Sequence, residues 1–220
     1  MTRLRDVVGS LAFVAVLGVL LFACAGRADL PWFWAYLAMW AASAVIGPLV
    51  VDPTLIKERL QPGPGGQDYL TAALFLVVGA GQHVIAAVDV GRFHWTDTVP
   101  RVVHLFGLVA MASALAVIVW AMAVNRFFSS VIRIQTDRGH ELVTAGPYRY
   151  VRHPAYAVGL LLMVGVGLAL GSWLGALFGF LLVPTILSRT AREDRVLRER
   201  LTGYAAYARE VRYRLLPGVW

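Results

Sequence analysis

Charge and cysteine are both scarce in this chain of 220 residues. Only 15% of the residues are charged, whereas 59% are hydrophobic and the mean hydropathy is +0.67. Soluble globular domains carry roughly 25% charged residues, so the composition excludes that class and indicates an integral membrane protein. Cys24 is the single cysteine, which excludes a disulfide within the chain. With no second thiol and no clustered His-Cys spacing, we expect no structural metal site.

Lysine is almost absent as well: Lys57 is the single lysine, whereas the chain has nineteen arginines. Together with abundant Ala, Val and Gly, this bias suggests a bacterium with a GC-rich genome. The net charge of +7 also occurs in nucleic-acid-binding proteins. Here, however, the arginines cluster between apolar segments, where membrane orientation explains them better. We therefore expect no nucleic-acid partner.

Long apolar stretches predict the fold. Residues 7–25, 31–51, 69–90 and 102–124 each have the roughly 20 apolar residues that a membrane-spanning helix needs. A fifth stretch, 156–187, is too long for one upright span, and Gly171-Ser172 divides it into two short helices joined by a tight turn. Pro184 is predicted to kink the second of these helices.

The overall prediction is an all-α, polytopic membrane helix bundle with four spans, a C-terminal helical hairpin and no Rossmann domain. Apolar residues at helical spacing predict a further cytosolic helix over 189–212. We divide the chain into residues 1–124, which form the anchor and a candidate acceptor-binding part, and residues 125–220, which carry the chemistry.

Arginine and lysine also predict the orientation. With a cytosolic N-terminus, 17 of these residues lie inside and 3 outside, which places both termini in the cytosol and the chain in the inner (plasma) membrane. A competing interpretation treats Leu21-Phe-Ala-Cys24 as a lipoprotein signal, but its removal would leave the spans with the wrong parity.

Polar residues accumulate after residue 124, where a bundle that needs only a connector would use fewer. Gly146-Pro147 begins a turn, and Pro154 holds His153 at the start of the following helix. Free backbone N–H groups at that helix start attract an anionic group. The glycines of 58–66 have no GxGxxG context, so this stretch is interpreted as a turn-rich linker.

Three segments carry a family resemblance. Asn125-Arg-Phe-Phe-Ser, the run Gly146-Pro-Tyr-Arg-Tyr-Val-Arg-His-Pro154 with Tyr156 and Gly159, and the later Arg-Glu-Asp resemble the isoprenylcysteine carboxyl methyltransferases and the phospholipid methyltransferases. The resemblance covers about residues 125–217. The sequence departs from the family where Glu193-Asp194 replaces the usual Glu-Glu and where Leu201-Thr-Gly203 replaces the usual Phe-Gly.

The resemblance implies an S-adenosylmethionine site without a Rossmann fold. Its cofactor contacts would be Tyr148, His153, Pro154, Tyr156, Glu193 and Asp194. Among the catalytic candidates, Arg152 would neutralise a carboxylate of the cofactor or acceptor, and Asn125 and Arg189 would lie on the acceptor side. His140 and Asp137 either shape the pocket or are merely solvated.

Glu193 also stands out on physical grounds. It lies four residues before Leu197 and therefore on the apolar stripe of its helix, where a carboxylate needs a partner. That partner is either Arg189, in a purely structural bridge, or a polar group of the cofactor. His153 has a similar alternative as a capped core histidine.

The expected activity is methyl transfer from S-adenosylmethionine to a carboxylate or amine, with S-adenosylhomocysteine as product. The acceptor would be an apolar small molecule or lipid from the bilayer, met at the cytosolic membrane face; the oligomeric state stays open. Two alternatives remain: an NADPH-dependent sterol- or steroid-type membrane reductase, whose motif has Asn where this chain has Ala155, and a non-enzymatic membrane protein.

Overall fold

The computed structural model describes residues 2–64 and 68–220, and within these residues every regular element is a helix. Five of the helical segments are long and apolar enough to cross a membrane. The four predicted N-terminal spans are confirmed: they are α1 (Thr2–Ala25), α2 (Pro31–Val50), α4 (Tyr69–Val88) and α5 (Arg101–Val124). A short π-helix, η1 (Asp89–Phe93), extends α4.

The hairpin predicted for 156–187 is also confirmed. Helix α6 (Pro154–Leu170) ends at Gly171, whose φ of +90° reverses the chain, and Ser172 caps the next helix by accepting a hydrogen bond from the Gly175 N–H. Helix α7 (Trp173–Gly179), a 3-10 turn (Phe180–Leu182) and α8 (Val183–Arg200) follow without a break. The tight 3-10 turn directly precedes Pro184, which lies in the first turn of α8.

The prediction of one helix over 189–212 is wrong. Helix α8 carries the apolar hairpin straight into the charged segment and ends at Arg200, and a separate short helix, α9 (Tyr204–Glu210), follows. Gly203 separates the two with a φ of +83°, a conformation that interrupts a right-handed helix. The apolar spacing continues across this break because Leu197 of α8 and the buried residues of α9 belong to one apolar cluster, against which Ile134 and Leu142 also pack.

The linker predicted for 58–66 overlaps the end of a helix that was not predicted. Helix α3 (Pro53–Leu60) has Pro53 in its first turn, and the Asp52 carboxylate accepts a hydrogen bond from the Thr54 N–H at its N-terminus. The linker interpretation therefore holds only after Leu60, and residues 65–67 of it lie outside the described residues.

Close packing fixes the position of α6 in the bundle. A Cβ on Gly107 of α5 would lie 2.5 Å from the Ala169 backbone nitrogen, and a Cβ on Gly167 would overlap the Gly175-Ala176 backbone of α7. Such small residues let helices approach closely inside a membrane. Helix α6 is thereby held between α5 and α7, and its N-terminus is held with it.

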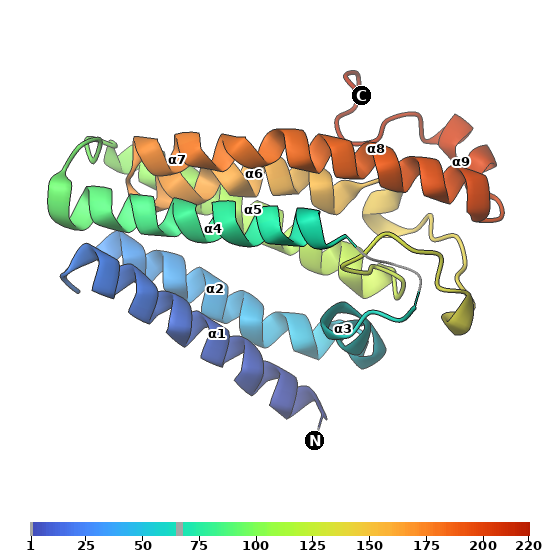
Figure 1. The fold of residues 1–220 in the computed structure, drawn as a ribbon, viewed down its shortest axis with the longest axis horizontal. Coiled ribbons are helices and arrows are strands. Elements are labelled where there is room, and N and C mark those ends of the chain that lie inside the picture. The colour runs from blue at the N-terminus through green and yellow to red at the C-terminus, as the bar shows by residue number, and fades with distance from the viewer. Residues whose placement is uncertain (1, 65–67) are drawn as a thin grey trace.

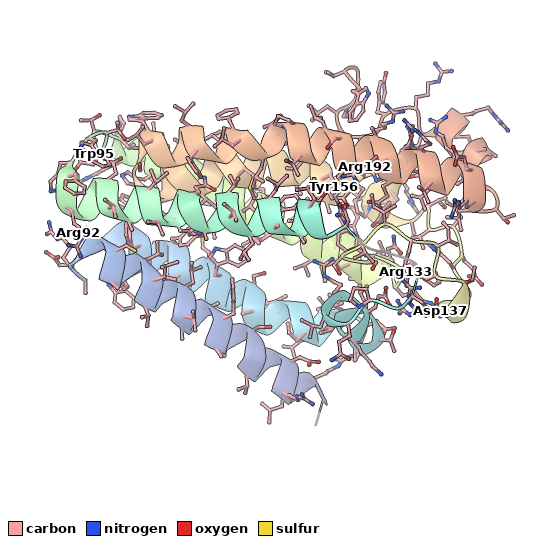
Figure 2. All side chains as sticks on the ribbon, in the orientation of Figure 1. Arg92, Trp95, Arg133, Asp137, Tyr156 and Arg192 are labelled. Carbon is pink, nitrogen blue, oxygen red and sulfur yellow. The ribbon has the colours of Figure 1, made fainter. Side chains whose placement is uncertain are left out.

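Figure 1 shows how the ends of the bundle are organised. The N-terminus of α1, α3, the segment 125–153 and α9 lie at one end, whereas η1 and the α6–α7 turn lie at the other. Arg133, Asp137, Tyr156 and Arg192 lie toward the first end, and Arg92 and Trp95 lie at the second (Figure 2). The segments that the charge pattern assigns to one side of the membrane thus share one end of the molecule.

Candidate active site

A pocket opens at the end of the bundle that holds segment 125–153. Its empty volume is about 800 Å³, counted out to its open mouth, and aromatic and aliphatic side chains form much of its wall. Seven of the nine predicted site residues line it: Asn125, Tyr148, Arg152, His153, Pro154, Tyr156 and Glu193.

His153 lies at the N-cap of α6, as predicted, with Pro154 in the first helical turn. Its backbone N–H donates to the Arg214 carbonyl (2.9 Å), and the Arg152 N–H donates to the Tyr213 carbonyl (3.0 Å), so the C-terminal tail holds the motif in place. The imidazole Nε2 lies 3.4 Å from the Tyr204 hydroxyl.

Asp194 is the centre of a buried ionic cluster. The side chain has no solvent exposure, and its carboxylate accepts hydrogen bonds from Arg152 Nε (2.7 Å), Arg198 Nε (3.0 Å), Arg214 Nε (3.0 Å) and the Tyr204 hydroxyl (3.0 Å). A carboxylate that is buried this fully needs several such partners. Asp194 does not line the pocket.

Arg152 differs from its predicted role. Its guanidinium is buried, and besides Asp194 it donates from Nη1 to the carbonyls at positions 211 and 212, both at 2.7 Å. The predicted role was to neutralise a carboxylate of the cofactor or acceptor, whereas in the structure most of its donors are bound within the protein. Arg152 therefore stabilises the junction between α6, α8 and the C-terminal tail.

Glu193, next to Asp194, faces different surroundings. It is partly exposed, lines the pocket and accepts a hydrogen bond from the Tyr156 hydroxyl (2.7 Å). That hydroxyl in turn accepts one from Arg189 Nε (2.6 Å). The adjacent acids thus separate, one into the protein interior and the other onto the pocket wall.

Arg189 forms an ion pair with Asp68 and not with Glu193, the acid considered as its partner in the sequence. Its Nη1 donates to Asp68 Oδ2 (2.7 Å) and its Nη2 donates to the Ser130 carbonyl (2.6 Å). It touches Glu193 only through the Tyr156 hydroxyl, and it does not line the pocket. The direct Arg189–Glu193 bridge is therefore not formed. Arg189 instead orients Tyr156.

Asn125 and Tyr148 both line the pocket and contact each other. Asn125 Nδ2 donates to the Tyr148 hydroxyl (3.1 Å), while its Oδ1 accepts from the Phe127 N–H (2.9 Å). Burial raises the pKa of Tyr148 above its ordinary value, so the phenol stays neutral at physiological pH. Tyr207 fixes the backbone here by donating to the Tyr148 carbonyl (2.7 Å).

His140 lines the same pocket and stacks on Phe127, with 4.6 Å between ring centroids. Its Nδ1 accepts a hydrogen bond from the Gln135 N–H (3.2 Å). Burial, followed by the charges of Arg133 and Arg138, lowers the pKa of His140 to about 4. A neutral imidazole thus shapes this part of the wall, one of the two roles that sequence analysis left open.

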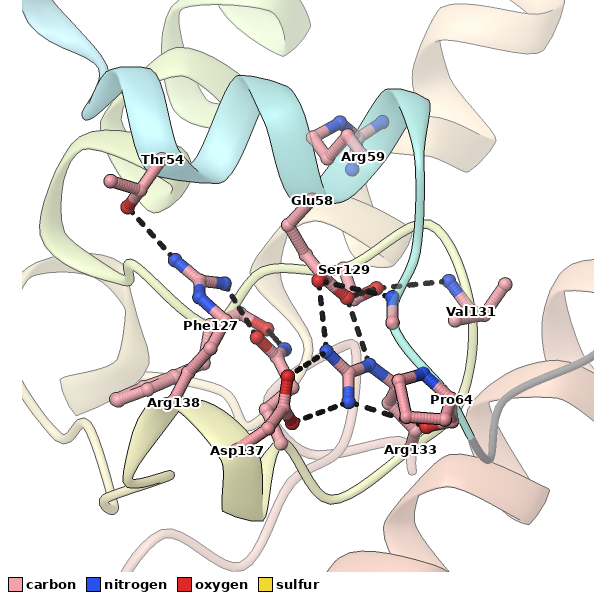
Figure 3. Close-up of polar contacts among 12 residues, drawn as sticks. Thr54, Glu58, Arg59, Pro64, Phe127, Ser129, Val131, Arg133, Asp137 and Arg138 are labelled. Atoms are coloured by element: carbon pink, nitrogen blue, oxygen red, sulfur yellow. Dashed lines mark hydrogen bonds and ion pairs between the residues drawn. The ribbon is translucent and has the colours of Figure 1, made fainter.

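A second ionic cluster ties α3 to the wall of the pocket (Figure 3). Arg133 donates to Glu58 from Nε (2.9 Å) and Nη2 (2.8 Å), and to Asp137 from Nη1 (2.7 Å). Ser129 adds a hydrogen bond to Glu58 (2.9 Å). The bonds from Arg133 hold the pKa of Glu58 below its ordinary range. Asp137 is therefore a structural partner.

Sequence analysis missed several residues that shape the site. Glu58 begins the stretch interpreted as a linker and Asp68 follows it, and no spacing links them to Arg133 or Arg189, which are distant in sequence. Tyr204 could have been found from the sequence, because it shares the apolar helical spacing of Leu197 and Leu201.

Comparison with known proteins gives matches to methyltransferases and to a metal-resistance protein. The family model described as phospholipid methyltransferase matches residues 102–202, which run from α5 to the end of α8. The cobalt-zinc-cadmium resistance protein CzcN of Cupriavidus metallidurans is 30% identical over 132 residues, 57% of this chain. The match spans only 55% of the length of that relative.

A solved structure shares the fold. The eukaryotic intramembrane Ras methyltransferase ICMT (isoprenylcysteine carboxyl methyltransferase) is similar over 94% of this chain and 75% of its own, with a TM-score of 0.54 and 18% identity. The matched segment contains α5, the Gly146–Pro154 motif, the α6–α8 hairpin and both acids of α8. Over residues 102–202 the chain therefore resembles the phospholipid methyltransferases in sequence, and over most of its length it shares the fold of the isoprenylcysteine carboxyl methyltransferase.

Proposed function

We propose that this protein transfers a methyl group from S-adenosylmethionine to a lipid-like acceptor. The observation that carries the proposal is the pocket at the end of the bundle, where Glu193 of α8, Tyr156 of α6 and the N-terminus of α6 share one wall. The predicted motif and the acid on α8 are 37 residues apart in sequence, yet one hydrogen bond joins them.

The residues present fit such a cofactor. Glu193 carries a carboxylate with acceptor capacity beyond its bond from Tyr156, which suits a ribose hydroxyl or an ammonium group. The first N–H groups of α6 have no partner within the helix and suit the carboxylate of the amino-acid part. The rings of Phe127 and Phe128 provide apolar surface for a base.

S-adenosylmethionine, when bound, supplies a methyl group on a sulfonium for in-line displacement by the acceptor. The protein contributes alignment, because Arg189 and Glu193 fix the Tyr156 hydroxyl from two sides and Asn125 fixes that of Tyr148. Aliphatic residues such as Val131, Leu142 and Leu197 reduce hydration of the pocket. Poor hydration favours reaction of an anionic nucleophile with a cation.

The position of the pocket suggests how the substrates meet. The pocket lies where the apolar helices end, so a water-soluble cofactor can enter from the aqueous side and an apolar acceptor can enter from the bilayer. The excess of Lys and Arg in the segments that share this end supports a cytosolic location for it, in the inner membrane. The acceptor group would be a carboxylate or an amine.

The test is isothermal titration of the purified protein with S-adenosylhomocysteine and, separately, NADPH. We expect S-adenosylhomocysteine to bind the wild type, and Glu193→Gln to weaken it at least about tenfold, because a charged acceptor is lost. Glu199→Gln is the matched control, since Glu199 is exposed on the same helix. Binding of NADPH alone would reject the proposal in favour of a reductase.

A further inference from the structure

Arg59 has no acidic partner among the residues that the structure describes. It lies in the last turn of α3, and its side chain is half-buried. Among the described residues its guanidinium forms no hydrogen bond and no ion pair, and no dashed line reaches it in Figure 3, although the neighbouring Glu58 is fully engaged. A guanidinium carries five N–H donors, which are costly to bury without acceptors.

The acids near Arg59 contact other residues. Glu58 binds Arg133, Asp68 binds Arg189, and Glu193 accepts from Tyr156. The three loop residues that the structure does not describe, Gly65-Gly66-Gln67, contain no acid in their sequence. Among the described residues, none of these three carboxylates forms an ion pair with Arg59.

Arg59 is held beside the pocket. Its guanidinium carbon lies 5.1 Å from the centre of the Phe128 ring, which lines the pocket. Its carbonyl accepts a hydrogen bond from the Ser130 hydroxyl (3.0 Å). Burial lowers the pKa of Arg59, and Tyr156 and Arg189 are close enough to act on its charge. Two guanidinium groups therefore lie in one region, and of the two only Arg189 forms an ion pair among the described residues.

We propose that Arg59 binds the anionic head group, a carboxylate or a phosphate, of an amphipathic acceptor. This rests on the proposed function, whose acceptor it narrows to acidic amphiphiles. The planar fork of a guanidinium matches either oxyanion with paired hydrogen bonds. The apolar tail would extend toward the adjacent membrane-spanning helices, while the cofactor occupies the wall formed by α6 and α8.

The location of Arg59 in the chain supports the acceptor rather than the cofactor. The residues assigned to the cofactor belong to the matched segment 102–202, whereas α3 precedes it. The Glu58–Arg133 pair anchors α3 to that segment and fixes the adjacent Arg59 relative to the pocket.

The test measures binding of three labelled probes that share one chain: tetradecanoate, tetradecyl phosphate and uncharged tetradecanol. The full-length protein is used in a non-ionic detergent. We expect the wild type to bind at least one acid about tenfold or more tightly than the alcohol. Arg59→Gln should bring that ratio close to one, and Arg59→Lys should retain part of it. Lys57→Gln is the matched control, because Lys57 is exposed on the same helix.

Equal binding of all three probes by the wild type would overturn the proposal, and so would an equal loss in Lys57→Gln and Arg59→Gln. The acid that is preferred identifies the head group as carboxylate or phosphate. Affinity for S-adenosylhomocysteine should be the same in Arg59→Gln and wild type, and its loss would move Arg59 to the cofactor side and refute the assignment. A wild type that prefers acids but does not bind S-adenosylhomocysteine would refute the proposed function alone.

Discussion

Substitution of the two neighbouring acids of α8, Glu193 and Asp194, should affect different properties of the protein. Asp194→Asn removes the charge at the centre of a buried cluster, whereas Glu193→Gln changes a partly exposed group on the pocket wall. We expect the first variant to lose stability, and the second to lose ligand affinity while it stays folded.

The magnitude for Asp194 follows from its partners. Arg152 is as buried as Asp194, so the substitution leaves an uncompensated guanidinium inside the protein, which costs about 3 kcal/mol or more. For a chain of this size that corresponds to an apparent melting temperature lower by about 6 °C or more. Glu193→Gln loses one charge-assisted hydrogen bond at a partly hydrated site, which costs about 1 kcal/mol.

The assay is thermal unfolding of the purified variants in detergent, with hydrogen–deuterium exchange over residues 204–220. Because Arg214 binds Asp194 and the C-terminal tail pairs with the backbone of Arg152 and His153, Asp194→Asn should increase exchange in this tail. Glu199→Gln serves as the control for loss of a negative charge. An Asp194→Asn variant with wild-type stability and wild-type exchange would refute the assignment of Asp194 to a structural role.

Three further predictions concern other parts of the molecule. Arg133→Met leaves Glu58 buried without a cation, so the apparent melting temperature should fall by about 6 °C or more and α3 should exchange faster; unchanged exchange in α3 would contradict its anchoring role. The folded-state pKa of His140 is about 4, below the ordinary value, so the unfolded chain takes up this proton first as the pH falls. Stability should therefore fall as the pH is lowered from about 6.5 to 4, and the fall should be smaller in His140→Gln. Equal pH profiles of stability in the variant and the wild type would contradict this role of His140. Gly107→Ala should lower the melting temperature because its Cβ meets the α6 backbone, whereas Gly79→Ala, with no atom within 4 Å, should not; the same result in both would reject the close packing of α5 on α6.

Much of the fold follows from local sequence. Apolar length alone predicts the four N-terminal spans, because each must cover the same membrane thickness. Gly171-Ser172 predicts the hairpin, since glycine readily takes the left-handed turn and serine caps the next helix. The same reasoning failed at Gly203, where apolar spacing continues through a break in the helix.

The site was predictable in its position but only partly in its roles. Pro154 places His153 at a helix start by stereochemistry, which is a local effect. Whether Arg152 has free donors depends on Asp194, 42 residues later, and the spacing of the sequence does not reveal such a contact. The same limit applies to α3, whose position depends on the Glu58–Arg133 pair across 75 residues.

The most direct test is methyl transfer by the purified protein in bilayers of total bacterial lipid. S-adenosylmethionine with a tritiated methyl group is added, and label is counted in the fraction that organic solvent extracts. The account predicts label in the lipid fraction with the wild type and with Glu199→Gln, and at least about tenfold less with Glu193→Gln. Equal labelling by Glu193→Gln and wild type would contradict the assigned site, and no labelling by a wild type that binds NADPH would contradict the proposed function.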